Sequence, residues 1–275
     1  MKFETAGVHL TYPGSPVPAL AGVSTSAEGG GFKAVAGPNG CGKTTLLRVM
    51  LGLLTPAKGE ALLDGRRIEE WEPRRRAQAV GVVTQREAFP FPLTVRGLVG
   101  MGRYPHLGPL QAERPTDRKE VEAAMAECGL TGFADRDVAT LSGGELQLAR
   151  IARALAQRPK ALALDEPSAS LDLHHRMRIF RLLRRKADEG RTVIVVVHDL
   201  ELAARFADEA LLLKAGKVVA DGPPAEVMRT DRLSDLYDWP VAVSREPESG
   251  MLRVTALEGD PACDDRQAEP VDGSD

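Results

Sequence analysis

Short, mostly apolar runs alternate with segments of helical length along the chain. The runs cover residues 32–36, 79–83, 161–164 and 193–197, and each is bounded by glycine or polar residues. Continuous apolar runs of this length are typical of parallel strands that are covered on both faces. The pattern therefore predicts an α/β fold with a buried central sheet.

Further strands are predicted near the N-terminus. Residues 3–12 alternate loosely between apolar and polar positions, and residues 20–26 form a second run. Residues 60–63 and the following Asp64-Gly65 indicate a strand and a tight turn. The basic residues 74–76 follow a proline on a predicted short helix, where they favour a solvated face over a binding patch.

The pattern changes to helical spacing between two of the apolar runs. Residues 95–103, 116–128 and 145–157 have this spacing and predict a helical lobe inserted into the sheet domain. Thr116, which follows a proline, is the expected N-cap of the second helix, and Gly129 is its expected stop.

The C-terminal third predicts smaller elements. A helix is expected through residue 206, strands at 210–214 and 217–220, and two short helices up to residue 237. The apolar positions of 241–257 flank a Glu-Ser-Gly turn and predict a hairpin. Residues 258–275 are acidic with little apolar content, and we expect this tail to be disordered.

Composition and charge narrow the class of protein. The chain has 275 residues, 43% hydrophobic and 27% charged, which is ordinary for a soluble globular protein. The net charge of −3 weighs against a protein that holds nucleic acid over its whole surface. Three widely spaced cysteines favour a reducing cytoplasm over a disulfide framework. We expect neither a signal peptide nor a membrane span, since no apolar run is long enough.

Residues 37–45 follow the first buried run and precede a helical segment. Their pattern is G-x-x-x-x-G-K-T, in which the glycines let the backbone curl its N–H groups toward an anion. Lys43 is expected to reach the β- and γ-phosphates of a nucleotide, and the Thr44 hydroxyl to reach Mg²⁺. The alternative is a glycine-rich turn with a surface lysine. The predicted loop comprises Gly37, Pro38, Asn39, Gly40, Cys41, Gly42, Lys43, Thr44 and Thr45.

Cys41 lies inside this loop. The positive helix end beside it is expected to lower the pKa of its thiol.

Polar residues stand at the carboxyl ends of three predicted strands, where ligands gather in α/β sheets. Gln85 can bond a metal-bound water through its amide oxygen, although it can also simply end a strand. Asp165 and Glu166 point in different directions and can serve Mg²⁺ and the attacking water separately. His198 can donate a hydrogen bond to a γ-phosphate.

Two further positions suit a nucleotide. Tyr12 ends the first strand, where its ring can stack on adenine or pack on the sheet. Ser142, Gly143 and Gly144 begin a helix and form a second anion-facing N-terminus. Capping alone explains the serine and one of the two glycines.

Together these motifs resemble those of ABC-type ATPases, in their order and rough spacing, over about residues 3–237. The resemblance implies a P-loop NTPase (RecA-like) core with an N-terminal antiparallel β subdomain and an inserted α-helical subdomain. The expected ATPase domain covers residues 1–240, with its core at 1–85 and 159–240 and its helical subdomain at about 86–158.

The same resemblance implies a role for each motif residue. By this resemblance, Tyr12 stacks on adenine, Gln85 senses the metal and the transporter, and Asp165 binds Mg²⁺. Glu166 is the catalytic base, His198 contacts the γ-phosphate, and Asp172 belongs to a loop that crosses the dimer interface. The residues that bind the ATP held by a second subunit are Ser142, Gly143 and Gly144. The chain departs from the family by Glu145, where glutamine is usual, and by Ser168-Ala169-Ser170.

The implied protein is the ATP-hydrolysing subunit of an importer, on the cytoplasmic face of the inner membrane. Its expected partners are a second copy of itself, a membrane permease and a periplasmic or extracellular substrate-binding protein, and no nucleic acid. The segment 102–108, Gly-Arg-Tyr-Pro-His-Leu-Gly, is similar to importers of iron(III)-siderophores, haem and cobalamin. The alternatives are a soluble ABC ATPase acting on nucleic acid or the ribosome, and a nucleotide-binding regulator without hydrolysis.

Overall fold

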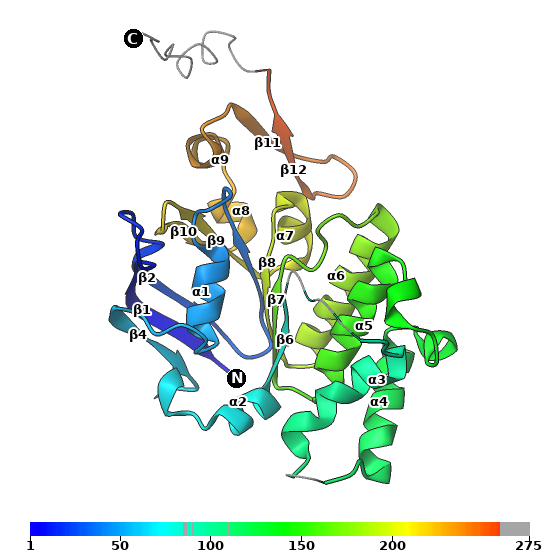
Figure 1. Ribbon diagram of the computed structural model, residues 1–275. Helices are drawn as coiled ribbons and strands as arrows, with labels where there is room; N and C mark the ends of the chain where they lie inside the picture. Colours follow the sequence, from blue (N-terminus) through cyan, green and yellow to red (C-terminus); the bar gives the residue numbers. More distant parts are fainter. Residues whose placement is uncertain (85–86, 88, 90, 109–110, 259–275) are drawn as a thin grey trace, which may run out of the picture.

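The computed structural model describes residues 1–84, 87, 89, 91–108 and 111–258. Gln85 and the predicted tail from residue 259 onward lie outside the described residues. A six-stranded sheet forms the centre of the molecule, in the order β10-β9-β3-β8-β7-β6 (Figure 1). Its strands are β3 (Phe32–Ala36), β6 (Val80–Val83), β7 (Ala161–Asp165), β8 (Thr192–Val196), β9 (Glu209–Lys214) and β10 (Lys217–Gly222).

Five strands of this sheet are parallel and β10 is antiparallel to β9. Every residue of β3, β7 and β8 is buried, as expected for parallel strands that are covered on both faces. The predicted α/β fold with a buried central sheet is therefore confirmed.

A four-stranded antiparallel sheet, in the order β2-β1-β4-β5, packs with the helix α1 against one side of the central sheet (Figure 1). These elements are β1 (Phe3–Leu10), β2 (Leu20–Ala27), β4 (Lys58–Leu63), β5 (Arg66–Arg67) and α1 (Lys43–Met50). A 3₁₀ turn, η1 (Ile68–Glu70), and α2 (Pro73–Ala79) lead from this sheet back to β6. The predicted N-terminal strands are thus present.

Helices cover the other side of the central sheet. Between β6 and β7 the chain forms α3 (Val95–Gly100), α4 (Pro115–Glu127), α5 (Gly143–Ala156) and the 3₁₀ turns η2 (Met101–His106), η3 (Thr131–Phe133) and η4 (Val138–Thr140). After β7 comes α6 (Leu173–Asp188), and α7 (Leu200–Phe206) follows β8. Phe32, Ala34 and Ala36 face this helical side, whereas Val35 faces α1. The central sheet therefore separates α1 from α5.

The prediction that Thr116 caps α4 is wrong. The N-cap is Arg114, and Pro115 is the first helical residue. Proline fits this position because its fixed φ suits the helix and its missing N–H would have no partner there. The carboxylate of Asp117 accepts a hydrogen bond from the Arg114 backbone N–H at 3.0 Å, which completes the cap. Gly129, at φ 65°, follows the helix as predicted.

The last elements are α8 (Pro224–Val227), α9 (Thr230–Tyr237), β11 (Val241–Arg245) and β12 (Leu252–Ala256). β11 and β12 pair antiparallel, which confirms the predicted hairpin. Over the part of the chain that the structure describes, no helix combines the length and the apolar character needed to cross a membrane.

Candidate nucleotide site

The loop between β3 and α1 has a backbone that only glycine can adopt at two positions. Gly37 has φ 147°, and a Cβ there would lie 2.1 Å from the Leu213 carbonyl oxygen. Gly42, the N-cap of α1, has φ 106°, and a Cβ there would lie 2.4 Å from the Ala19 carbonyl oxygen. The glycines thus allow both the left-handed turns and the close approach of neighbouring strands.

Lys43 is the buried cation of this loop. Its side chain is 5% exposed, and its Nζ donates to the carbonyl oxygens of Gly37 at 2.8 Å and Pro38 at 2.9 Å. The ammonium group is therefore held over the loop rather than at the surface, which contradicts the alternative of a turn with a surface lysine. A cation at the start of a helix, beside unpaired backbone N–H groups, forms an anion-binding site.

Thr44 connects the loop to the carboxyl end of β7. Its hydroxyl donates to Asp165 Oδ1 at 3.0 Å. Burial, with the like charge of Glu166, raises the pKa of Asp165 and outweighs the opposing hydrogen bond from Thr44. A hydroxyl and a carboxylate at this distance are hard oxygen donors of the kind that Mg²⁺ prefers.

Glu166 turns away from Asp165 because its backbone is left-handed, with φ 49°. This conformation is uncommon for a residue other than glycine. The Glu166 carboxylate forms a hydrogen bond with His198 Nε2. The two adjacent carboxylates therefore face different partners, as the sequence predicts.

Tyr12 lies beside the loop, next to Thr45. Its hydroxyl is 3.2 Å from Thr45 Oγ1, and its ring lines a cavity of about 410 Å³ beside the loop. Val17, Pro18, Lys43 and Glu166 line the same cavity. The cavity thus offers an aromatic and apolar surface next to an anion-binding loop, which suits a nucleotide.

Ser142 caps α5 on the opposite side of the sheet. Its hydroxyl accepts from the Glu145 backbone N–H at 3.3 Å, and the Glu145 carboxylate accepts from the Ser142 N–H at 2.8 Å. Hydrogen bonds from Ser142 hold the pKa of Glu145 below its usual value. The unusual Glu145 therefore completes a capping box, which glutamine could also form.

The structure gives a steric reason why position 144 is a glycine, which the sequence alone did not give. A Cβ at Gly144 would lie 2.2 Å from Cδ2 of the His175 ring, whereas a Cβ at Gly143 would meet only a Leu171 methyl at 3.7 Å. The two glycines are therefore not equivalent.

His175 also joins Asp172, the N-cap of α6. The Asp172 carboxylate accepts from the His175 backbone N–H at 2.8 Å and lies 2.9 Å from its Nδ1. These contacts lower the pKa of Asp172. The sequence did not lead us to predict this role for His175, although an N-cap residue followed three positions later by its partner is a recognisable signal.

The predicted residues form two groups. The cavity brings together Tyr12, the loop and Glu166, with Asp165 and His198 directly behind them. None of the described residues 142–144 lines that cavity. The predicted contribution of Gln85 falls outside the described residues.

The expectation that Cys41 has a lowered pKa is wrong. Its side chain is 4% exposed, and burial raises the pKa of the thiol by more than the nearby Lys43 lowers it. The side chain points toward Gly37 inside the loop rather than into solvent. Desolvation disfavours the thiolate, so the helix end does not activate this cysteine.

Comparison with known proteins places these motifs in one family. A sequence profile described as "ABC transporter" matches residues 20–169. The hemin import ATP-binding protein HmuV of Streptomyces coelicolor is 42% identical over 90% of this chain and 87% of its own length. The ferric enterobactin transport ATP-binding protein FepC of Escherichia coli is 39% identical over 83% of this chain and 84% of its own.

The cobalamin import ATP-binding protein BtuD of Halobacterium salinarum is 40% identical over 94% of this chain. The chain spans 64% of the length of that relative.

Solved structures agree in fold. A metal-chelate type ABC transporter in an inward-facing conformation superposes with a TM-score of 0.82 at 27% identity, over 93% of this chain and 97% of the other. A dimeric ATP-binding cassette in a post-hydrolysis state, bound to ADP and Pi, has a TM-score of 0.73 at 30% identity, over 81% and 98%. Both the resemblance read from the motifs and the predicted fold class are confirmed, and the chain belongs to the ABC transporter family.

Proposed function

We propose that the chain is the ATP-binding and ATP-hydrolysing subunit of an ABC importer that takes up a metal chelate such as an iron(III)-siderophore, haem or cobalamin. The names of its relatives support this proposal, because they are import proteins for hemin, ferric enterobactin and cobalamin. The structural likeness to a metal-chelate type transporter points the same way.

The observation that carries the proposal is the arrangement around the P-loop. A buried lysine, a hydroxyl–carboxylate pair and a carboxylate–histidine pair lie at or directly beside a cavity that Tyr12 also lines. Hydrolysis of a phosphoanhydride requires charge neutralisation, positioning and an oriented water. This set of groups can supply all three.

Each residue has a proposed role in that reaction. Lys43 and the loop N–H groups hold the phosphates, and Tyr12 stacks on the adenine. Thr44 and Asp165 would hold Mg²⁺, which neutralises phosphate charge when bound. The Glu166 carboxylate accepts a proton from water as the water oxygen bonds to the γ-phosphorus and the bond from that phosphorus to the ADP oxygen breaks.

His198, which contacts the Glu166 carboxylate, is proposed to keep it oriented and to donate a hydrogen bond to the γ-phosphate. Gln85 is proposed to sense the metal and the permease. Asp172 is proposed to act at the interface between two subunits.

One chain supplies half of the proposed site. Because Ser142, Gly143 and Gly144 lie on α5, away from the cavity, we infer that they complete the site of a second copy in a two-fold, head-to-tail dimer. The dimeric cassette among the structural relatives supports this arrangement. Ser142 then serves both as helix cap and as γ-phosphate donor.

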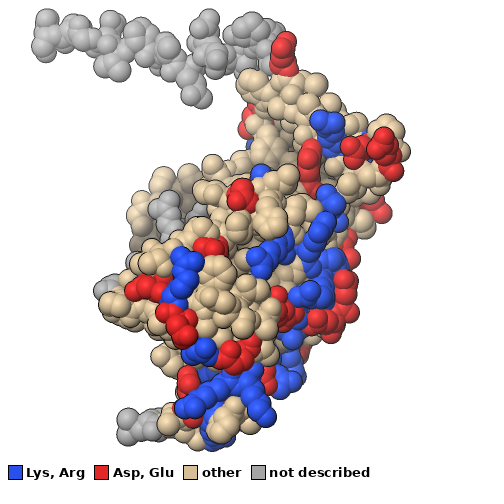
Figure 2. All heavy atoms as spheres, turned by 90° about the vertical axis from the view of Figure 1, so that its right-hand side faces the viewer, with Lys and Arg blue, Asp and Glu red and all other residues tan. Residues whose placement is uncertain are grey.

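The proposed partners of the dimer are permease subunits, through which it sits on the cytoplasmic face of the membrane, and a substrate-binding protein. Nucleic acid is not among them. Figure 2 shows basic side chains in a band on the face over the helical side of the molecule, with acidic side chains along its edge. The net charge of −3 weighs against a positive field over the whole surface. The ATPase domain is proposed to cover residues 1–240, with the helical subdomain at about 86–158.

The substitution Glu166→Gln tests the proposal. The amide is close in size to the carboxylate but cannot take the proton, so hydrolysis should fall by about 10²- to 10⁴-fold while ATP binding persists. The variant should elute as a dimer in ATP and as a monomer in ADP during size-exclusion chromatography. Wild-type turnover by the variant would show that Glu166 is not the base.

A further inference from the structure

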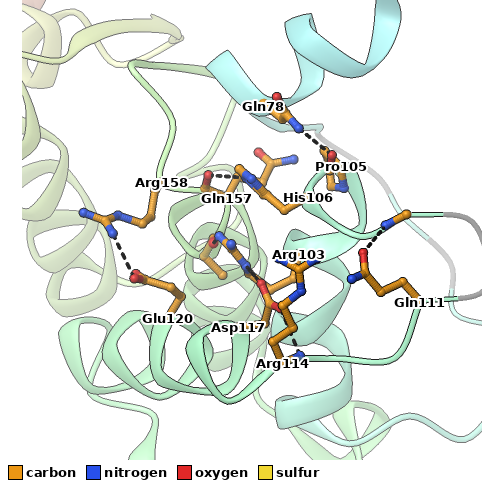
Figure 3. Close-up of polar contacts among 12 residues, drawn as sticks. Gln78, Arg103, Pro105, His106, Gln111, Arg114, Asp117, Glu120, Gln157 and Arg158 are labelled. Carbon is orange, nitrogen blue, oxygen red and sulfur yellow. Dashed lines mark hydrogen bonds and ion pairs between the residues drawn. The ribbon is translucent and has the colours of Figure 1, made fainter.

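The segment 102–108, whose sequence is similar to that of importer ATPases, contacts the C-terminal end of α5 (Figure 3). Arg103 is 7% exposed, and its guanidinium donates to Asp117 at 2.9 Å and to the Ala156 carbonyl oxygen at 2.6 Å. His106 Nε2 lies 2.9 Å from the Gln157 carbonyl oxygen. Two side chains of the segment therefore contact carbonyl groups that end α5, where cations are favourable.

Gly102 brings the two backbones together. A Cβ at this position would lie 2.1 Å from the Arg153 carbonyl oxygen of α5. Burial raises the pKa of Asp117, but hydrogen bonds from the Arg114 N–H and Arg103 together outweigh it. The pKa therefore lies below its usual value, and the carboxylate stays charged in this contact. The segment and the end of α5 thus form one packed unit.

This unit is tied to the core through α2. Gln78 Nε2 donates to the Pro105 carbonyl oxygen at 2.7 Å (Figure 3), and Arg74 Nε donates to the same oxygen at 2.8 Å. Arg74 Nη2 also donates to the Leu107 carbonyl oxygen at 2.6 Å. We call these three hydrogen bonds the α2 anchor. Since α2 runs directly into β6 of the central sheet, the anchor joins the central sheet to the helical side.

The position of Ser142 is sensitive to small changes in the angle of α5 at its anchored C-terminal end. The helix has 14 residues, so Ser142 lies about 21 Å from the anchored end. A tilt of about 5° at one end moves the other by about 2 Å, and hydrogen bonds tolerate only a few tenths of an ångström. Displacements of about 1 Å can reduce a reaction rate by about 100-fold.

We propose that Arg74 and Gln78 are positioning residues for ATP hydrolysis. By fixing the angle of α5 against the central sheet, the α2 anchor sets where Ser142 and the two following glycines meet the nucleotide of the second subunit. This inference rests on the proposed function, because it needs Ser142, Gly143 and Gly144 of one chain, which we call the signature, to act on the ATP of another. Neither residue lines the cavity of its own chain.

The test removes the donors and leaves the helix in place. Arg74→Met and Gln78→Leu are combined in one chain, and Arg75→Met is the matched control, because Arg75 lies on the same helix with a side chain that is 79% exposed. The measurements are kcat and KM for ATP, the affinity of the separate chain for a fluorescent ATP analogue, and Tm.

We expect the double variant to lose about tenfold or more in kcat, with analogue affinity within about twofold of wild type and Tm within a few degrees. Arg75→Met should behave as wild type. Arg74→Lys, which keeps a donor, should recover part of the loss.

Wild-type kcat in the double variant would overturn the inference, as would a loss of kcat matched by an equal loss of analogue affinity or by unfolding. Failure of the proposed function itself would appear differently, as a wild-type chain that does not hydrolyse ATP.

Discussion

The substitution Gly144→Ala should destabilise the protein even though alanine favours helices. The added Cβ would lie 2.2 Å from Cδ2 and 2.3 Å from Cγ of the His175 ring, so the ring must leave its position. Atoms near the root of a side chain cannot move without a new rotamer. The displaced ring would lose its Nδ1 contacts with the Asp172 carboxylate, 2.9–3.0 Å long, at the start of α6.

Gly143→Ala is the matched control. It adds the same methyl group in the first turn of the same helix, and its nearest neighbour is Leu171 Cδ2 at an ordinary 3.7 Å. Alanine improves helix propensity by up to about 1 kcal/mol at either position. The propensity gain cancels in the comparison, which leaves an overpacking cost of about 1–3 kcal/mol for Gly144→Ala.

Thermal and urea unfolding of the two variants measure that cost. For a chain of this size, about 1–3 kcal/mol corresponds to a Tm difference of about 2–12 °C, with Gly144→Ala the lower. The double variant Gly144→Ala/His175→Ala should regain most of the difference, because the ring no longer occupies the space. Equal Tm values for the two single variants would refute the reasoning.

Two further predictions concern buried groups of the site. Because the pKa of Asp165 is raised in the folded protein, its ionised carboxylate destabilises the fold, and this cost disappears as pH falls. Asp165→Asn should therefore raise the Tm of the nucleotide-free protein more at pH 8 than at pH 4. The same substitution should lower Mg²⁺-dependent hydrolysis by about 10²-fold or more. A Tm decrease at pH 8 would contradict this. The raised pKa and burial of Cys41 predict slow alkylation by iodoacetamide at pH 7.5, measured by mass spectrometry against a small thiol; modification as fast as that of the small thiol would contradict it.

Local patterns predicted most of the framework. The buried strands, the P-loop and the helix after it follow from residues that are close in sequence, because glycine conformation and apolar runs act locally. The misplaced cap of α4 also had a local signal, since Pro115 at the first helical position is a common arrangement.

Features that depend on distant contacts were not predictable. The reason for Gly144 lies in His175, which is 31 positions away in sequence and contacts it only in the folded chain. The burial of Cys41 depends on how the loop packs, and this burial reversed the expected direction of its pKa shift. The α2 anchor pairs residues about 30 positions apart through a backbone carbonyl oxygen, which leaves no side-chain pattern in the sequence.

The central claim is that each ATP site is completed by the signature of a second chain, and complementation tests it most directly. Lys43→Ala removes the phosphate cation, and Ser142→Arg blocks the signature, so each variant alone should be inactive. In an equal mixture, about half of the dimers contain both variants, and each of these has one intact site. We predict recovery of roughly a quarter of wild-type ATPase activity. A mixture no more active than the two separate variants would contradict the claim.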